Sequence, residues 1–447
     1  MKSFFAVLFF VSISFSQQLR IKVDNSQIEH AALLSLSGEK TEFIDSLKIN
    51  QSGEFNYDLG KIKVVGFFRL QLDNYKFLDF LNDGKDISLE TDADDILDSM
   101  KVISSESNKL FYEFVRLNKD YKTKSELLQF VLAKFPKDDN YYEISKKRMA
   151  DLQLEYLKFI NETSQTDPKS FIARYIRSAQ LPVINFSLQP EEQLAYLQNH
   201  SLDNVDFSDN KLIYSDVFTN KTIEFLTYYR NPQLPKELLE KEFIKASDKI
   251  LDKAKVNQLV YQQIVDYLID GFKKFGFDLV LDHIIENYVV KDDLCLDEET
   301  ENSIEKRVDQ AQKLSVGTEA PSIILPDSTG KEINLSDIKA ERIVVLFYSS
   351  ECPHCRDLIP KLKKVYESQD KKEFEVFAVS LDSDVDEWKK FIQETGADWI
   401  NVIAPGGWDS IAASRYFIYA TPTIFVIDKD KRIILKPLTV EEIVKML

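Results

Sequence analysis

The chain has 447 residues, of which 44% are hydrophobic, and a formal net charge of −17. This length and composition predict two or three domains with sizeable cores. The negative charge indicates an acidic surface that anionic membranes repel, and no basic patch in the sequence suggests binding to nucleic acids.

Residues 1–16 have the pattern of a secretory signal peptide. Lys2 supplies a basic residue, residues 4–13 form an apolar stretch, and Ser14 and Ser16 are small residues before a cleavage site. The apolar stretch is shorter than a membrane-spanning helix needs, and no later segment approaches that length. We expect cleavage before Gln17, export to the periplasm, and a mature protein that does not span the membrane.

Residues 17–100 are predicted to form a β-rich domain. Short hydrophobic runs occur at residues 19–23, 31–36, 41–49, 54–59, 64–72, 76–81 and 86–90. Turn-forming residues separate them, for example at 24–26, 37–39 and 51–53. Many short strands between regularly spaced turns are typical of a β-sandwich.

Residues 101–300 are predicted to form an α-helical middle domain and a linker. Apolar residues recur at helical spacing in 110–117, 152–160 and 259–268, and prolines interrupt the pattern between these segments. An acidic segment at 291–301 is predicted to bridge to the last domain. Cys295 lies in this segment, and it can be a buried inert thiol, a resolving cysteine or an intermolecular partner.

A Cys-x-x-Cys motif, Cys352-Pro353-His354-Cys355, follows an apolar β run at 343–348 and precedes a helix predicted from Arg356 toward Tyr366. At a strand-to-helix junction this motif suits dithiol–disulfide exchange, because its spacing lets the two sulfurs meet across one helical turn. The free N–H groups and positive dipole of the helix N-terminus favour a thiolate at Cys352.

A second motif, Thr421-Pro422-Thr423, leads into a predicted strand at 424–427, a turn at 428–431 and another strand at 432–435. Proline before a strand donates no ladder hydrogen bond, and its preceding peptide bond can be cis. With a strand at 374–380 and a helix at 384–395, the alternation indicates a sheet covered on both faces.

On these motifs, residues 315–447 resemble the thioredoxin fold, and within it the periplasmic thioredoxin-like proteins of the TlpA/ResA type in the redoxin/AhpC-TSA group. The resemblance implies that Cys352, Cys355 and a cis-Pro422 converge in space, and that Pro360 bends the active-site helix. Residues 17–300 resemble the β and helical domains that precede such a domain in Bacteroidota proteins. The expected fold class is multidomain: an N-terminal β-sandwich-like domain, an α-helical middle domain and a C-terminal α/β thioredoxin fold.

Two positions depart from the family pattern. Leu346 stands where thioredoxins often have a buried Asp, and Leu358 stands where ResA-like proteins often have a Glu. The resemblance therefore assigns no proton-transfer group. Pro353 and His354 match the dipeptide of DsbA-like oxidants, in which a cationic histidine stabilises the thiolate and makes the disulfide more oxidising. The ResA-like surroundings favour a reductant, so the direction of transfer stays open.

These features predict an exported thiol-disulfide oxidoreductase with a redox-active Cys352–Cys355 disulfide. Cys352 attacks a substrate disulfide and Cys355 resolves the mixed disulfide. His354 tunes the thiolate, and Pro422 holds the partner chain beside Cys352. Residues for substrate binding are Pro353, Thr421 and Thr423.

The expected partners are protein thiols or disulfides and a membrane or periplasmic electron donor or acceptor, with no nucleic acid. We expect no cofactor and no metal, because a cysteine pair needs two further ligands and His30, His200 and His283 are scattered along the chain.

Two alternatives remain. One is a redoxin-type peroxidase, although Tyr348, Ser349 and Ser350 stand where that group has the proline and threonine of a peroxide pocket. The other is a partner-binding protein in which the β and helical domains carry the main role.

Overall fold

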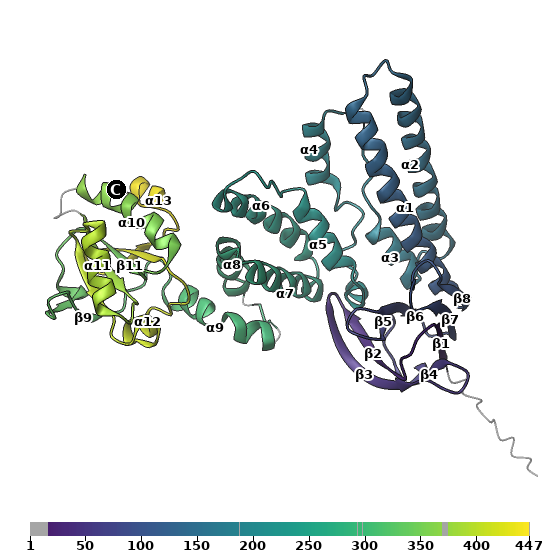
Figure 1. Cartoon of the computed structure of the whole chain (residues 1–447), viewed down its shortest axis with the longest axis horizontal. Coiled ribbons are helices and arrows are strands. Elements are labelled where there is room, and N and C mark those ends of the chain that lie inside the picture. The colour runs from purple at the N-terminus through teal and green to yellow at the C-terminus, as the bar shows by residue number, and fades with distance from the viewer. Residues whose placement is uncertain (1–16, 187, 293, 297, 369–373, 447) are drawn as a thin grey trace, which may run out of the picture. The chain divides into compact units, whose positions relative to one another are not determined.

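The computed structural model describes residues 17–186, 188–292, 294–296, 298–368 and 374–446. The predicted signal peptide lies outside these residues. The chain forms two compact units, divided between Tyr267 and Leu268 (Figure 1). The strand-rich region and most of the middle helices lie in the first unit, and the last helices before residue 315 lie in the second.

The N-terminal unit begins with two four-stranded sheets, ordered β4-β1-β7-β8 and β3-β2-β5-β6. Side chains alternate between the two faces of a strand, so every second residue of β1 is buried: Leu19, Ile21 and Val23. The strands are β1 Gln18–Asp24, β2 His30–Ser37, β3 Lys40–Lys48, β4 Glu54–Asp58, β5 Gly66–Gln71, β6 Phe77–Asn82, β7 Ile87–Asp92 and β8 Lys101–Ser104. The prediction of a β-rich N-terminal region is confirmed, with β8 as a strand that the sequence pattern missed.

Helices follow the sheets, as predicted. The helices are α1 Glu106–Lys134, α2 Asn140–Thr166, α3 Phe171–Ala179, α4 Pro190–His200, α5 Val217–Thr227, α6 Lys236–Ala254 and α7 Gln258–Phe275. Helices α1 and α2 form a long hairpin (Figure 1). Its centre is a stacked pair, Tyr121 and Tyr156, with ring centroids 4.3 Å apart. Ser105 and Asp139 cap the two helices by accepting backbone N–H groups.

The C-terminal unit contains a five-stranded sheet in the order β13-β12-β11-β14-β15. Strands β11, β12 and β13 are parallel, and β14 and β15 are antiparallel to their neighbours. The elements are α8 Asp278–Ile284, α9 Glu298–Lys313, β9 Ile324–Pro326, β10 Glu332–Asn334, β11 Arg342–Tyr348, α10 Pro353–Glu367, β12 Phe374–Ser380, α11 Val385–Thr395, β13 Ile400–Ile403, α12 Ile411–Arg415, β14 Thr423–Asp428, β15 Ile433–Leu435 and α13 Val440–Met446. A π-helical turn, Ile285–Val290, continues α8.

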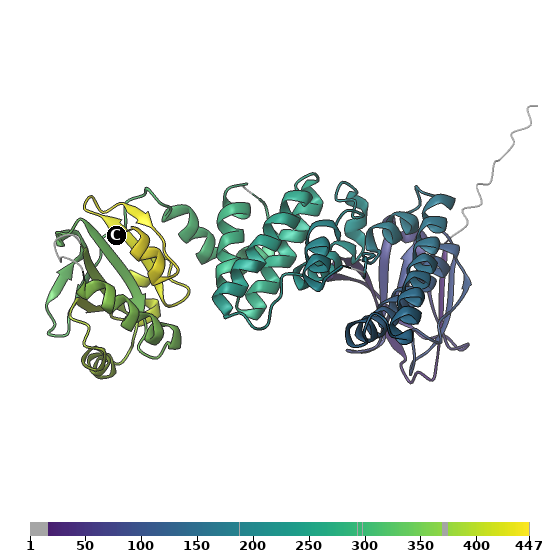
Figure 2. The ribbon, with the colours of Figure 1, turned by 90° about the horizontal axis from the view of Figure 1, so that it is seen from above.

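Both faces of this sheet are covered, as the alternation of strands and helices predicted (Figure 2). Val345 and Phe347 of β11 belong to one apolar core with α12 and the segment after α9. Val344, Leu346 and Tyr348 belong to the opposite core, together with α10, α11 and α13. The register pairs Tyr348 with Ser380, so the loops that follow β11 and β12 leave the same edge of the sheet.

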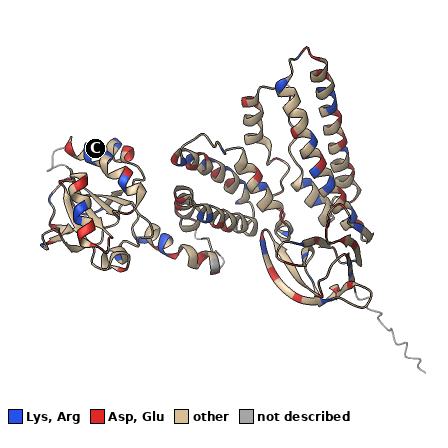
Figure 3. Cartoon of the chain, in the orientation of Figure 1, with Lys and Arg blue, Asp and Glu red and all other residues tan. Residues whose placement is uncertain are grey.

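Acidic and basic residues are interspersed along the helices of both units (Figure 3). Among the described helices, none combines the length and the apolar composition that are needed to cross a membrane.

Candidate active site

The Cys-x-x-Cys motif lies where β11 ends and α10 begins. Cys352 is the N-cap of α10, and Pro353 occupies the first helical position, which requires no backbone donor. The helix thus begins three residues before the predicted Arg356. Cys355 lies in the first turn and is fully buried, whereas Cys352 is half-buried. Pro360 lies within α10.

The two thiols have opposite electrostatic environments. Burial opposes ionisation of Cys352, but hydrogen bonds from the Cys355 thiol, the Thr421 side chain and the backbone of Cys355 and His354 outweigh it and lower the pKa of Cys352 below 9.0. Burial raises the pKa of Cys355 to about 12. Cys352 is therefore the sulfur that ionises first, and Cys355 retains its proton.

The loop before β14 lies against this motif. The Thr421–Pro422 peptide bond is cis, and the Thr421 carbonyl oxygen lies 3.2 Å from the Cys352 sulfur. The Thr421 side chain also hydrogen-bonds the sulfur of Cys355. The hydroxyl of Thr423 donates instead to the Ala420 carbonyl, 2.8 Å away. The structure thus brings Cys352, Cys355, Thr421 and the cis proline together.

The side chains of Pro353 and His354 are exposed, and His354 contributes its backbone to Cys352. Leu346 and Leu358, the two departures from the family pattern, are both buried apolar residues.

Asp382 is a residue of this site that the sequence motifs missed. Its buried carboxylate accepts the Ser349 hydroxyl at 2.8 Å, the Ser350 backbone N–H at 2.9 Å and the Ser380 hydroxyl at 2.7 Å. The backbone of Ser349 in turn hydrogen-bonds the Cys355 sulfur. Asp382 therefore holds the turn that connects β11 to Cys352. Its only sequence signal is an acidic residue just after a buried strand.

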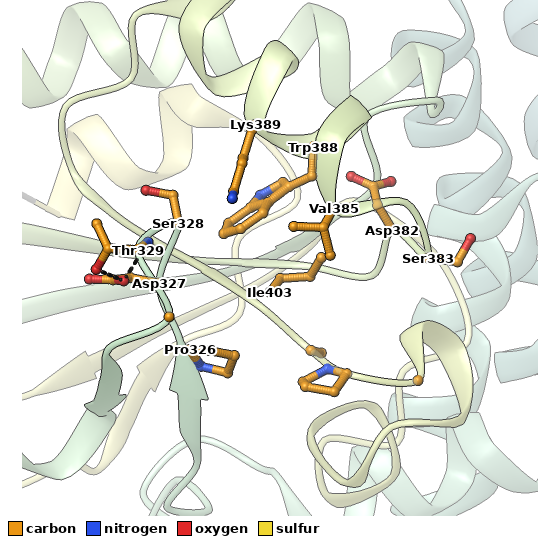
Figure 4. A pocket seen from close by; sticks show the side chains of 14 residues that line it. Pro326, Asp327, Ser328, Thr329, Asp382, Ser383, Val385, Trp388, Lys389 and Ile403 are labelled. Carbon is orange, nitrogen blue, oxygen red and sulfur yellow. Dashed lines mark hydrogen bonds between the residues drawn. The ribbon is translucent and has the colours of Figure 1, made fainter.

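A half-open pocket lies beside this turn (Figure 4). Its walls come from the β9–β10 turn, the start of α11 and the loop after β13, namely residues 326–330, 382–383, 385, 388–389 and 403–406. Asp382 lines the pocket, so its carboxylate lies between the pocket and the turn. Trp388 also lines the pocket. Its indole N–H donates to the Tyr348 hydroxyl at 2.9 Å, and both side chains are buried.

Cys295 is exposed, so its interpretation as a buried thiol is wrong. It lies in the short connection between the π-helical turn and α9, where no core covers it. Among the described residues, no group of three or more His, Cys, Asp or Glu side chains is placed to hold a metal ion.

Comparisons with known proteins concern mainly this C-terminal region. The AhpC/TSA family profile matches residues 316–436. The thiol-disulfide oxidoreductase ResA of Bacillus thuringiensis subsp. konkukian is 28% identical over 123 residues, which are 28% of this chain and 69% of that protein. A solved domain of a possible thiol-disulfide isomerase from Cytophaga hutchinsonii is 32% identical, with a TM-score of 0.28, over 30% of this chain and 90% of that domain.

A thioredoxin-like protein from Bacteroides caccae is 22% identical, with a TM-score of 0.38, over 60% of this chain and 96% of that one. Residues 316–436 match the AhpC/TSA family profile, and this C-terminal region is a thioredoxin-fold domain of the TlpA/ResA-like type.

Proposed function

We propose that this protein is an exported thiol-disulfide oxidoreductase that exchanges its Cys352–Cys355 dithiol and disulfide with protein substrates. The observation that carries the proposal is the difference between two neighbouring thiols. Cys352 is half-buried with a lowered pKa, and Cys355 is buried with a pKa raised to about 12. A nucleophile and a resolving thiol require these opposite properties.

In the reducing direction, the Cys352 thiolate attacks one sulfur of a substrate disulfide. A Cys352–substrate bond forms, the substrate S–S bond breaks, and one substrate thiolate leaves. Cys355 then loses its proton to the substrate thiolate released in the first step and attacks the Cys352 sulfur, which releases the second substrate thiolate. The substrate gains two electrons, and the protein is left with a Cys352–Cys355 disulfide. The reverse sequence oxidises a substrate dithiol.

Substrate binding is assigned to the loop before β14 and to the start of α10. Pro422 has no N–H to donate, so the Thr421 and Thr423 backbones beside it are the groups that pair with an extended substrate segment. The exposed ring of Pro353 lies next to Cys352 in sequence and offers an apolar contact. These residues place a substrate disulfide against the sulfur that ionises first.

The direction of electron transfer depends on the stability of the Cys352 thiolate. The backbone hydrogen bonds at the start of α10 stabilise it, and they include one from the backbone of His354. Such stabilisation favours the reduced form and an oxidising disulfide. The partners are periplasmic protein thiols and a membrane or periplasmic donor or acceptor of electrons.

Equilibration of the full chain in glutathione buffers, with thiol counting as the readout, tests the proposal. A potential near about −270 mV identifies a thioredoxin-like reductant, and one near about −120 mV an oxidant. Failure to form a Cys352–Cys355 disulfide at any ratio of reduced to oxidised glutathione would contradict the proposal. Consumption of hydrogen peroxide without disulfide exchange supports a peroxidase instead.

A further inference from the structure

Helix α9 lies outside the family match but contacts the loop that leads to the cis proline. The match begins at residue 316, whereas α9 ends at Lys313. Immediately after α9, Leu314 is buried in the core beneath the sheet. One face of α9 carries Arg307, Gln310 and Lys313, whose spacing of three residues places them in a row. All three reach residues 416–419.

Gln310 holds the start of this loop. Its side chain is 3% exposed, and its amide donates to the carbonyl oxygens of Tyr416 at 2.9 Å and Phe417 at 3.2 Å. Phe417 has a φ of 47°, a left-handed conformation that is uncommon for a bulky residue. The Lys313 ammonium lies 4.7 Å from the centre of the Phe417 ring. Helix α9 therefore supports a strained position of the loop.

Arg307 holds the end of the loop. Its guanidinium lies 4.0 Å from the centre of the Tyr419 ring and pairs with both Asp282 and Asp278, the latter at 2.6 Å. Asp282 also hydrogen-bonds the Tyr419 hydroxyl. The network therefore fixes Tyr419 from two helices, α8 and α9. Two residues further along the chain, Thr421 contacts Cys352.

We propose that Arg307 and Gln310 are positioning residues for disulfide exchange, which hold residues 416–420 so that Thr421 meets both Cys352 and the main chain of a polypeptide substrate. This inference rests on the proposed function and extends it, because it makes α8 and α9 part of the substrate-binding apparatus. It also predicts selectivity. A substrate that pairs with the loop depends on the network, and a small disulfide that makes no main-chain contact does not.

The test compares the full chain with Arg307→Gln, Gln310→Ala and Tyr419→Phe, using Lys306→Ala on the exposed face of α9 as the matched control. Two substrates are reduced in parallel: a synthetic peptide closed by one cystine, and hydroxyethyl disulfide. Loss of one or two loop contacts is expected to slow the peptide reaction about three- to tenfold. The hydroxyethyl disulfide rate should change less than about twofold, since that substrate makes no hydrogen bonds to the loop. Lys306→Ala should leave both rates unchanged.

The pH dependence of Cys352 alkylation by iodoacetamide gives a second readout that needs no exchange activity. Displacement of Thr421 should shift the pKa of Cys352 in Arg307→Gln and Gln310→Ala, because Thr421 contacts that sulfur with both its side chain and its carbonyl oxygen. Equal losses with both disulfides and an unchanged Cys352 pKa would overturn the inference and leave a purely structural role. If Arg307→Gln does not fold, Tyr419→Phe, which loses only the hydroxyl, decides by the same criteria. A wild-type chain inert toward both disulfides refutes the proposed function, and the alkylation profiles still decide whether the network positions Thr421.

Discussion

The Asp382→Asn substitution tests whether a buried carboxylate holds the turn before Cys352. Asparagine keeps the size of the side chain but removes the charge and one acceptor oxygen. Hydrogen bonds to a charged acceptor contribute about 1.5–3 kcal/mol, against about 0.5–1.5 kcal/mol for neutral pairs. Asp382 accepts three donors, and the substitution weakens two of these bonds and leaves the Ser380 hydroxyl proton without its acceptor. We expect the weakened hydrogen bonds to lower the free energy of unfolding by about 2–4 kcal/mol. The neutral side chain is easier to bury, and this offsets about 1 kcal/mol of that loss.

Tryptophan fluorescence during urea denaturation measures the unfolding free energy of the C-terminal unit, in which Asp382 lies. All 3 tryptophans of the chain, Trp388, Trp399 and Trp408, lie in the C-terminal unit, so their signal reports its unfolding separately from the N-terminal unit. Asp384→Asn is the matched control, because Asp384 is an exposed helix cap and asparagine caps as well as aspartate. If Asp382→Asn and Asp384→Asn destabilise the unit equally, Asp382 does not hold the turn.

Three further predictions concern the two thiols and the packing of the N-terminal unit. Thr421→Val removes a side-chain hydrogen bond to Cys352 and should raise the pKa of Cys352, measured by iodoacetamide alkylation. Thr423→Val is the control and should leave that pKa unchanged, because the Thr423 hydroxyl donates to the Ala420 carbonyl and not to Cys352. Equal shifts in both variants would argue against the assigned contact. Because the pKa of Cys355 is raised from 9.0 to about 12 on folding, its contribution to stability is present below pH 9.0 and lost as the pH rises toward 12. The stability difference between the reduced wild type and Cys355→Ala should therefore shrink over this window, and a constant difference would be inconsistent with a raised pKa. In the N-terminal unit, a Cβ at Gly66 would lie 2.5 Å from the Tyr214 Cβ, so Gly66→Ala should destabilise by about 1–3 kcal/mol in urea denaturation followed by circular dichroism. Gly271→Ala lies in the part of α7 that belongs to the C-terminal unit, with no atom within 4 Å of the new Cβ, and should instead stabilise that unit by about 0.5–1 kcal/mol. Destabilisation of equal size in both variants would show that crowding at Tyr214 is not the cause.

The sequence was most informative where local chemistry determines local structure. Alternating hydrophobic residues predicted β1 to β7, because a half-buried strand needs that period. The apolar run at 343–348 and the following Cys-x-x-Cys predicted the junction of β11 and α10. Strand β8 escaped prediction, because a four-residue edge strand with mostly exposed side chains has too short a pattern.

Contacts between distant segments that carry no recognised motif were beyond the reach of sequence reasoning. Asp382 reaches Ser349 and Ser350 only because β11 and β12 pair in a register that aligns Tyr348 with Ser380. The row of Arg307, Gln310 and Lys313 looks like an ordinary solvated helix face, and only the tertiary structure places it against the cis-proline loop. Local periodicity carries no information about such pairings.

Trapping of the mixed disulfide tests the central claim most directly. The reduced full chain, with either Cys355→Ala or Cys352→Ala, is incubated with a cystine-bridged peptide and analysed by mass spectrometry after acid quenching. The account predicts a peptide adduct on Cys352 in the Cys355→Ala protein, released by dithiothreitol, and no adduct at Cys355 in the Cys352→Ala protein, because that thiol is buried with a pKa of about 12. Equal adducts at both cysteines, or none at Cys352, would contradict it.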